Sequence, residues 1–495
     1  QKDLYLKSFY MKYHLVTLGC QMNKADSERV RTVIEDMGYT WTDFEEEAGL
    51  LGVLACSVRQ KSIDKVYSRI YKWNKWKNRR NLISFVSGCV LPADKEKFLK
   101  MFDLVFEMKE LPRLPEMLSQ CGITTPLSIR RGNIPVVEEH HLAITGIKPG
   151  SNPLLNVNPV SEKIRLAGRP EEEIRGFWHV KPAYESSYEA FIPIQNGCDK
   201  FCTFCAVPYT RGREVSRPSA EILDEIRDLV NGGYKSITLL GQNVNSYGLD
   251  RHGSEISFPE LLRQIGEFGK NSGKDFWVYF TSPHPRDMTG EVIEVISEYS
   301  CLAKQIHLPI QSGDDKVLMK MNRKYSVNDY RKIIAVIRKL LPDATIFTDI
   351  IVGFTGETDE QFENTRKAME EFKYNMAYIA KYSPRPGAAS SRWDNDIPGE
   401  VKTRRLHILT EELTKHTIVY NQSLIGKKLK VLVTGRDRKH EYLSALTEGR
   451  IVLRFASDDD SLTGNFAEVL IESATNFAVQ GRLIDKKVEE AVYHG

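Results

Sequence analysis

Three cysteines occupy one short segment near the middle of this 495-residue chain, at Cys198, Cys202 and Cys205. No further cysteine or histidine follows closely behind them. A structural zinc ion takes four protein ligands, whereas a 4Fe-4S cluster held by three cysteines keeps one iron open for another molecule. The spacing therefore favours a 4Fe-4S cluster with an open iron. A zinc site that borrows a distant fourth ligand is the alternative.

The cysteine spacing and the residues that follow it resemble a known superfamily. Cys-x-x-x-Cys-x-aromatic-Cys is similar to the cluster loop of radical S-adenosylmethionine enzymes, and Phe204-Cys-Ala-Val-Pro-Tyr-Thr-Arg-Gly-Arg-Glu looks like their methylthiotransferase branch. The resemblance implies that Cys198, Cys202 and Cys205 are catalytic. S-adenosylmethionine would occupy the open iron, and one electron from the cluster would cleave it to a 5′-deoxyadenosyl radical.

Three more cysteines, Cys20, Cys56 and Cys89, each end a short apolar run. Each run is typical of a buried parallel strand. Because ligand sites of open α/β sheets lie beyond the carboxyl ends of the strands, we expect the three thiols to converge there. One cysteine in such a position is usually a small buried hydrophobe, but three in succession weigh against that interpretation.

The surroundings of these cysteines resemble the amino-terminal motif of methylthiotransferases. Leu18-Gly-Cys-Gln-Met-Asn and Cys56-Ser-Val-Arg carry the resemblance. It implies that Cys20, Cys56 and Cys89 are the metal ligands of a second, auxiliary 4Fe-4S cluster.

Some residues depart from the family pattern or match no motif. Leu54-Ala55 stands where the family commonly has Asn-Thr, and Thr355 stands where it usually has proline in Gly-Phe-Pro-Gly-Glu. Neither departure removes a ligand. Cys121 and Cys301 lack neighbouring ligands, and we interpret them as packing residues.

Alternating strand and helix patterns predict an α/β multidomain protein. Residues 11–121 are expected to form a flavodoxin-like domain, and residues 122–183, with scattered prolines and weak periodicity, are typical of a linker. Residues 184–415 are expected to form a partial (βα)6 radical S-adenosylmethionine barrel, and residues 418–485 resemble the small β-barrel called TRAM. The six strands expected in the core are 190–195, 236–241, 277–282, 305–309, 345–354 and 376–383.

Polar side chains lie at the carboxyl ends of several expected core strands, where barrels of this kind hold ligands. The candidates for binding the S-adenosylmethionine cofactor are Gln242, Ser282, Gln311 and Asp349. Each of them is alternatively a local loop cap, which is the commoner fate of serine and aspartate. We also expect Asn243 and Asn245 to face a flipped adenine.

The net charge is only +3, so an RNA site has to be a local patch rather than a global field. The resemblance to TRAM implies that the tail binds RNA, although such barrels also occur as plain structural modules. Removal of the tail is expected to weaken tRNA binding and to spare cosubstrate cleavage. No stretch approaches the length of an apolar membrane helix, and we expect a cytoplasmic protein.

Together these resemblances imply a tRNA methylthiotransferase. The segment Leu-Gly-Gln-Asn-Val-Asn-Ser-Tyr247 points to the branch that methylthiolates C2 of N6-dimethylallyladenosine in the tRNA anticodon loop. The implied cofactors are two 4Fe-4S clusters and S-adenosyl-L-methionine, and the implied partners are tRNA and an electron donor of flavodoxin or ferredoxin type; no sulfur donor is indicated. Alternatives are the same chemistry on threonylcarbamoyl-adenosine tRNA or on a ribosomal-protein aspartate, and a non-catalytic iron–sulfur or zinc RNA-binding protein.

Overall fold

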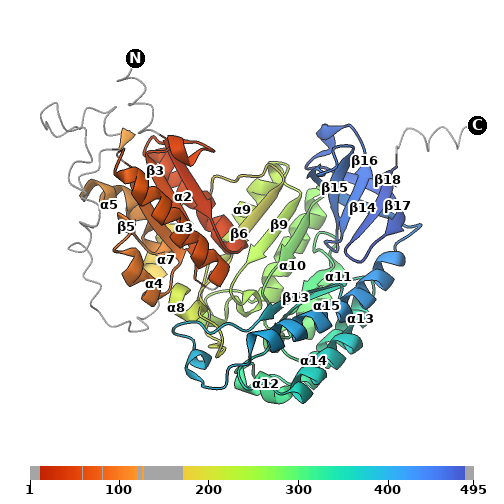
Figure 1. The fold of residues 1–495 in the computed structure, drawn as a ribbon. Helices are drawn as coiled ribbons and strands as arrows, with labels where there is room; N and C mark the ends of the chain where they lie inside the picture. Colours follow the sequence, from red (N-terminus) through yellow and green to blue (C-terminus); the bar gives the residue numbers. More distant parts are fainter. Residues whose placement is uncertain (1–11, 58, 81, 121–124, 127–170, 485–495) are drawn as a thin grey trace, which may run out of the picture.

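The computed structural model describes residues 12–57, 59–80, 82–120, 125–126 and 171–484. Figure 1 shows a central core with an amino-terminal sheet domain on one side and a small β-barrel on the other. Every helix in the described ranges is too short or too polar to span a membrane. Cys121 and most of the expected linker lie outside the described residues.

The amino-terminal domain contains a five-stranded parallel sheet in the order β2-β1-β3-β4-β5. Its strands are β1 (Lys12–Thr17), β2 (Thr40–Trp41), β3 (Leu50–Cys56), β4 (Ile83–Cys89) and β5 (Leu104–Val105). This order is that of flavodoxin-like folds and confirms the predicted fold of the domain. All of β3 is buried, because central strands of a parallel sheet are covered on both faces.

Helices cover both faces of this sheet (Figure 1). They are α2 (Gln21–Asp36), α3 (Gln60–Lys77), α4 (Pro92–Phe98), α5 (Leu114–Gln120) and α7 (Glu171–Trp178). Ile34 of α2 packs in one apolar cluster with Phe177 and Trp178 of α7. Ile70 and Trp73 of α3 pack in a second cluster on the opposite face. α7 falls within the expected linker, yet its apolar side chains belong to the core of this domain.

The central core contains six parallel strands that follow one another in chain order. They are β6 (Glu189–Pro193), β9 (Ser236–Leu240), β10 (Trp277–Phe280), β11 (Gln305–His307), β12 (Thr345–Val352) and β13 (Met376–Lys381). Three pair in the order β10-β9-β6 and three in the order β11-β12-β13. Among the described residues, the two sets are joined by a bridge between Val278 of β10 and Leu302, which precedes β11. The expected open six-strand barrel is confirmed, with a narrow seam between its halves.

The core helices are α8 (Val207–Arg211), α9 (Ser219–Asn231), α10 (Phe258–Ser272), α11 (Gly290–Glu298), α12 (Asp315–Lys320), α13 (Val327–Leu340), α14 (Asp359–Phe372) and α15 (Gly399–Gln422). Most core helices lie outside the strands, while α8 lies toward the amino-terminal domain (Figure 1). Ile226, Ile265 and Ile337 from three of these helices lie in one large apolar cluster with strand residues. The barrel core is therefore continuous across the seam.

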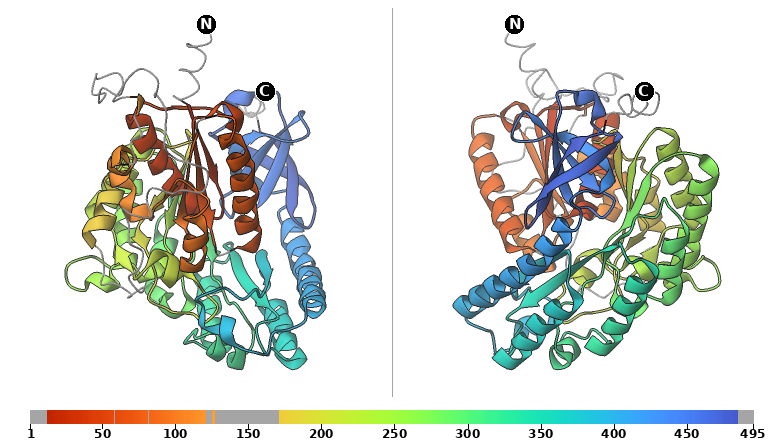
Figure 2. Two further views of the ribbon diagram at one scale, coloured as in Figure 1. Left: turned by 60° about the vertical axis from the view of Figure 1, so that its left-hand side comes forward. Right: turned by 90° about the vertical axis from the view of Figure 1, so that its right-hand side faces the viewer.

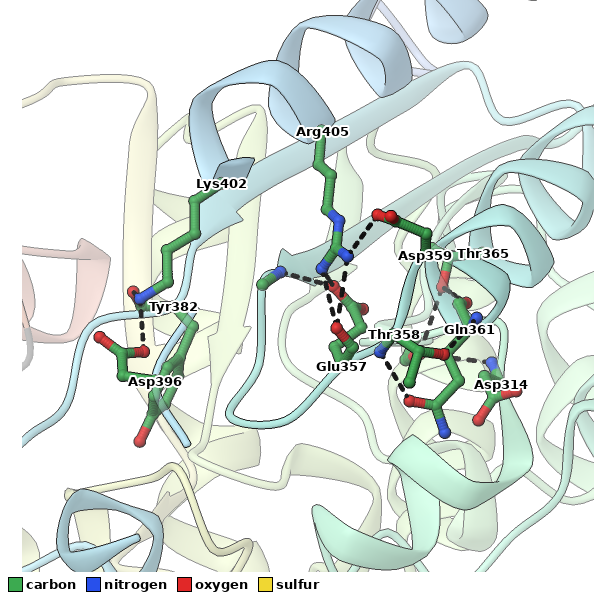
Figure 3. A network of polar contacts seen from close by, with 12 residues as sticks. Asp314, Glu357, Thr358, Asp359, Gln361, Thr365, Tyr382, Asp396, Lys402 and Arg405 are labelled. Carbon is green, nitrogen blue, oxygen red and sulfur yellow. Dashed lines mark hydrogen bonds and ion pairs between the residues drawn. The ribbon is translucent and has the colours of Figure 1, made fainter. Parts of the chain in front are cut away.

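A buried polar network fixes α15 to the loop that follows β12 (Figure 3). Arg405 of α15 donates hydrogen bonds to the carboxylates of Glu357 (2.7 Å) and Asp359 (2.8 Å). Glu357 also accepts a hydrogen bond from the backbone N–H of Gly353 (2.7 Å). Loss of one partner from a buried ion pair costs ~3–5 kcal/mol, because the other charge stays buried and unpaired. The loop after the strand that carries Asp349 is thus firmly held.

Lys402 and Thr355 lie in the same region as this network. Lys402, also on α15, donates to the Tyr382 carbonyl (3.1 Å) and pairs with Asp396 (2.6 Å), which fixes the segment after β13. Thr355 is buried, and its hydroxyl has no hydrogen-bond partner. An unsatisfied buried hydroxyl costs ~1–3 kcal/mol. A residue without a hydroxyl, such as the proline usual in the family, avoids that cost.

The tail barrel is a closed five-stranded barrel at the carboxyl-terminal end of the described chain. Its strands, paired in the order β14-β15-β16-β18-β17, are β14 (Lys428–Arg436), β15 (Tyr442–Thr447), β16 (Val452–Ala456), β17 (Phe466–Ala474) and β18 (Ala478–Leu483). Four of them match expected strands. The sequence pattern missed β18, because Gly481 interrupts it; at this position a Cβ would lie 2.2 Å from the carbonyl oxygen of Leu470.

The tail barrel packs against the amino-terminal ends of the core strands, and Figure 2 shows α15 leading to it. Its turn Glu448-Gly449-Arg450 makes several of the contacts, and Phe466 of β17 packs on Trp277 of β10. The Arg450 guanidinium donates to the Thr238 hydroxyl of β9 (2.9 Å) and lies 4.0 Å from the ring centroid of Tyr279 of β10. The hydroxyl of Thr345 at the start of β12 donates to the Gly449 carbonyl (2.8 Å). This turn closes the end of the core barrel that is opposite the cysteine loop.

Candidate active site

Cys20, Cys56 and Cys89, here called the sheet triad, lie together at the carboxyl edge of the amino-terminal sheet. Cys20 is the residue that caps α2, while Cys56 and Cys89 are the last residues of β3 and β4 and pair directly in the ladder. Cys20 is exposed and the other two are buried. Regular structure therefore brings together three thiols that are far apart in the sequence, as expected from the strand pattern.

Two neighbours shape this edge of the sheet. The side-chain amide of Asn23, on the first turn of α2, donates to the carbonyls of Leu18 (2.6 Å) and Ala55 (2.7 Å) and so ties two cysteine-bearing segments together. Gly19 has a φ of +112°, and a Cβ there would lie 2.7 Å from Cβ of Cys56. The backbone at position 19 therefore needs glycine.

A buried arginine from the core contacts the sheet triad. Arg211 Nε lies 2.9 Å from Sγ of Cys89, and its Nη2 pairs with Asp26 at 2.6 Å. Burial raises the pKa of the Cys89 thiol to about 12, and the Arg211 charge opposes this shift. A metal ligand must be a thiolate, so the guanidinium favours the form of Cys89 that binds metal.

Cys198, Cys202 and Cys205, here called the loop triad, lie in one loop after β6. The short antiparallel strands β7 (Gln195–Asn196) and β8 (Val215–Ser216) close this loop at its base. Gly197 has a φ of +79°, and a Cβ there would lie 2.0 Å from the Arg213 carbonyl oxygen, so only glycine fits.

The segment after α12 supports the loop triad from outside. The Asn322 side chain donates to the carbonyls of Lys200 (3.2 Å) and Phe201 (3.1 Å). Arg323, which is buried, donates from Nη1 to Sγ of Cys202 (3.4 Å). Burial raises the pKa of Cys198 to about 12 and that of Cys205 to about 11. The cysteines of the loop triad are partly exposed, and each triad has one arginine that donates to a sulfur.

The donor set fits iron–sulfur clusters better than single ions. Across the described parts of the chain, no three His, Cys, Asp or Glu side chains converge closely enough to hold one metal ion. A single zinc ion needs four ligands around one point. A 4Fe-4S cluster binds its thiolates at different irons, so three more widely spaced cysteines suit it. Three thiols beside a glycine with a positive φ, and an arginine N–H donor toward one sulfur, therefore fit a cluster with one open iron at each triad.

Three of the four cosubstrate candidates lie together at the carboxyl ends of the core strands. The ring of His307 connects two of them: Nδ1 accepts a hydrogen bond from the Ser282 N–H (3.3 Å), and Nε2 lies 3.0 Å from Oδ2 of Asp349. The Gln311 N–H donates to the Asp349 carbonyl (2.9 Å). Ser282 and Gln311 both have positive φ values, 60° and 71°, which are uncommon outside functional or tightly turned segments.

Gln242 and Asn245 have different surroundings from those expected. Oε1 of Gln242 accepts a hydrogen bond from the Gly197 N–H, so this side chain supports the loop triad. The side chain of Asn245 donates to the His284 carbonyl (3.1 Å) and accepts from the His284 N–H (2.8 Å). The Asn245 amide is thus used to hold the His284 backbone, and its contact with adenine stays a prediction.

Several buried polar atoms at the same end of the barrel have no hydrogen-bond partner. They are Oε1 of Gln195, Oδ1 of Asn243 and Nε2 of His284. Burial lowers the pKa of His284 to about 2, so its ring is neutral. Because buried polar atoms in native proteins are nearly always paired, such atoms are natural contacts for a bound polar ligand.

Sequence reasoning missed four polar residues of the site. They are Arg211, Glu214, His307 and Arg323. Glu214 is buried, accepts a hydrogen bond from the Ser246 hydroxyl (2.6 Å), and has a pKa that burial raises to about 7. The signal was available in part, because the segment 204–214, which resembles the family, contains Arg211 and Glu214. Sequence alone does not tell a buried arginine from an exposed one.

Comparisons with known proteins agree with this geometry. Residues 192–369 match the family model described as "Radical SAM superfamily", and residues 12–107 match "Uncharacterized protein family UPF0004". A tRNA-2-methylthio-N(6)-dimethylallyladenosine synthase of Cellvibrio japonicus is 33% identical over 98% of both chains, and that of Yersinia pestis is 35% identical over 96% of this chain and 92% of its own. The solved radical S-adenosylmethionine methyltransferase TsrM from Kitasatospora setae aligns over 77% of each chain with a TM-score of 0.50 and 14% identity, which shows the fold alone.

Proposed function

The chain belongs to the radical S-adenosylmethionine methylthiotransferase family, and from this premise we propose that it methylthiolates C2 of N6-dimethylallyladenosine in the anticodon loop of tRNA. The observation that carries the proposal is the second three-cysteine site, the sheet triad, which Arg211 of the loop connects to the first site. A second three-cysteine site would hold a cluster with an open iron, and a sulfur-transferring enzyme needs such a place to hold sulfur.

Each triad would hold one 4Fe-4S cluster. The loop triad would leave an iron open for S-adenosylmethionine, and the sheet triad would leave one open for sulfur. When bound, these groups supply one-electron chemistry and the methylthio group. The protein contributes thiolate ligands, N–H donors from Arg211 and Arg323 toward sulfur, and a buried setting.

The carboxyl-end loops of the core would orient the cosubstrate. His307 holds Ser282 and Asp349 in one arrangement, and the unpaired atoms of Asn243 and His284 offer a further acceptor and a ring nitrogen. Gln242 acts on the cosubstrate only through the loop that it supports. Polar groups fixed in this way set the orientation of a ligand, which is the requirement of a reaction at one carbon atom.

The adenine would have to leave its stack to reach the site, and an unpaired anticodon loop makes this inexpensive. The names of the relatives support the dimethylallyl form as substrate. On α3, several cations are already paired: Lys72 and Arg69 with Glu45, and Lys77 with Asp103. Cations of the tail barrel are paired as well: Lys430 with Asp275, Arg436 with Asp460 and Arg482 with Glu472. The tail barrel is therefore proposed as the RNA surface on its resemblance to TRAM alone.

Mass spectrometry of nucleosides would test the proposal. Purified protein with reconstituted iron, S-adenosylmethionine and a flavodoxin- or ferredoxin-type reductant would be incubated with tRNA that bears N6-dimethylallyladenosine. We expect 2-methylthio-N6-dimethylallyladenosine, and little product with unmodified tRNA. Reaction with threonylcarbamoyl-adenosine tRNA or a ribosomal protein, and none with the dimethylallyl form, would refute the substrate and leave the reaction type standing.

A further inference from the structure

Arg211 joins the two cysteine triads through contacts in both directions. Toward the amino-terminal domain, its Nε lies 2.9 Å from Sγ of Cys89, and its Nη2 lies 3.0 Å from Oδ1 of Asn23 and 2.6 Å from Oδ2 of Asp26. Toward its own loop, its Nη1 lies 3.3 Å from Oδ1 of Asn196, and its carbonyl accepts from the Asn196 side-chain amide (3.0 Å).

Asn196 stands two residues before Cys198, so Arg211 is coupled to both triads at once. A guanidinium suits this position because its five donors lie in one rigid plane and can serve several acceptors together. A lysine ammonium on a flexible stem cannot hold three partners on two domains in the same way. Only 6% of the Arg211 side chain and none of the Asp26 side chain is exposed, so solvent screens their charges weakly.

We propose that Arg211 is a positioning residue for the auxiliary cluster: it holds the Cys89 sulfur by an N–H donor and a positive charge, and fastens that sulfur to the loop that carries the other triad. This inference rests on the proposed function, because it assumes a cluster at the sheet triad. Hydrogen bonds to cluster sulfurs and nearby charge set the reduction potential of an iron–sulfur cluster. A cation beside Cys89 stabilises the reduced, more negative cluster and so raises its potential.

Asp26 makes the sign of the effect testable in both directions. Its carboxylate opposes the charge of Arg211, so Asp26→Asn leaves the cation uncompensated, while Arg211→Gln leaves a buried anion near the cluster. We therefore expect Arg211→Gln to lower the midpoint potential of the auxiliary cluster and Asp26→Asn to raise it. A misfolded site would not shift in opposite directions for the two variants.

The experiment uses the full-length protein with Cys198, Cys202 and Cys205 replaced by alanine, so that only the auxiliary cluster remains. Its potential is measured by redox titration followed by electron paramagnetic resonance, and its stability by iron release to a chelator. Arg211→Gln should lower the potential and weaken iron retention by ~10–100-fold, the range found for residues that support metal ligands. Arg211→Lys should keep part of the increase in potential that the Arg211 charge causes, because a positive charge remains. It should weaken iron retention, because the planar guanidinium contacts are lost.

Arg31→Gln is the matched control. Arg31 lies on α2 and also pairs across the domain boundary, with Glu185 at 3.4 Å, but it contacts no cysteine in the described structure. It should leave the potential unchanged. If Arg211→Gln, Asp26→Asn and Arg31→Gln all match the parent in potential and iron retention, the inference is wrong and the proposed function stands. If the alanine background itself binds no iron, the auxiliary cluster is refuted, and the inference fails with it.

Discussion

The sheet triad and the loop triad present the same number of thiols by opposite means. In the sheet triad, two strand ends and a helix start each contribute one cysteine, and the ladder pairs Cys56 with Cys89. In the loop triad, all three cysteines lie between two short strands, and the loop depends on contacts with Asn322 and Arg323 from a distant segment. The first site inherits its shape from regular structure, whereas the second obtains it from tertiary contacts.

The two sites also share a buried arginine that contacts a cysteine sulfur. Each has a buried arginine that donates to one of its sulfurs, Arg211 to Cys89 and Arg323 to Cys202. Neither arginine belongs to the segment that carries the thiol it contacts. The difference in scaffold and the similarity of the arginines together predict how each site should respond to damage.

Removal of either triad should have the largest effect and should separate the two roles. Replacement of the loop-triad cysteines Cys198, Cys202 and Cys205 by alanine should reduce 5′-deoxyadenosine formation to background, because no open iron then holds the cosubstrate. The same change at Cys20 and its two partners should stop methylthio product while uncoupled cleavage remains measurable. Liquid chromatography with mass spectrometry follows both products. Normal methylthio product from the second variant would contradict the assignment of the sheet triad.

Removal of the tail barrel should damage the loop triad more than the sheet triad. The sequence alone predicts that cleavage survives truncation. In the structure, however, Arg450 contacts Thr238 of the core barrel, and Phe466 packs on Trp277 with ring centroids 4.5 Å apart. A chain that ends at Gln422 should therefore lose the iron of the loop triad and its cleavage activity, while the sheet triad keeps its iron. Iron analysis and 5′-deoxyadenosine assays measure this.

A single substitution at Arg450 tests the contribution of the turn Glu448-Gly449-Arg450 separately from that of the whole tail barrel. Arg450→Ala removes one hydrogen bond and one cation–π contact and should lower the free energy of unfolding by ~1–3 kcal/mol, as measured by denaturant titration. For the truncation at Gln422, normal cleavage activity would show that the core barrel does not need closure by the tail barrel.

Replacement of Gly197 should cause the loop triad to lose iron, because a steric clash adds to the strain of the positive φ. Gly197→Ala places a Cβ 2.0 Å from the backbone carbonyl oxygen of Arg213, in addition to ~1–3 kcal/mol of strain from the positive φ. We expect loss of the loop-triad iron, measured by absorbance and iron content. Gly253→Ala is the control, because Gly253 has the same φ of +79° and nothing within 4 Å of the added atom. Equal iron loss in both variants would refute the steric argument.

The smallest effect is expected at the cysteines outside the triads. Cys301 is buried against Gly269, where an added Cβ would lie 2.4 Å from its sulfur, so it serves packing. Cys301→Ser should leave iron per chain unchanged and cost on the order of 1 kcal/mol of stability. We predict the same iron content for Cys121→Ser, at a position outside the described residues. A loss of one cluster's iron in either variant would contradict this interpretation.

The sequence by itself determines the strands and helices, because these follow from local patterns of apolar and polar residues. Apolar runs that end in Gly-Cys or Ala-Cys predict the strand ends at Cys56 and Cys89 and place Cys20 just beyond β1, which ends at Thr17. The strand–helix alternation predicts the six core strands, because both patterns depend on neighbouring residues only. The parallel order of the sheets follows from the same alternation. The fifth tail strand was missed where Gly481 interrupts the pattern.

Only the tertiary structure decided which polar groups meet. Arg211 and Asp26 are 185 residues apart in the chain, and Arg323 and Cys202 are 121 apart. A charged side chain looks the same in sequence whether water or protein surrounds it, since burial depends on how separate domains dock. For that reason the thiols were found from the sequence, and the arginines that hold them were found only from the fold.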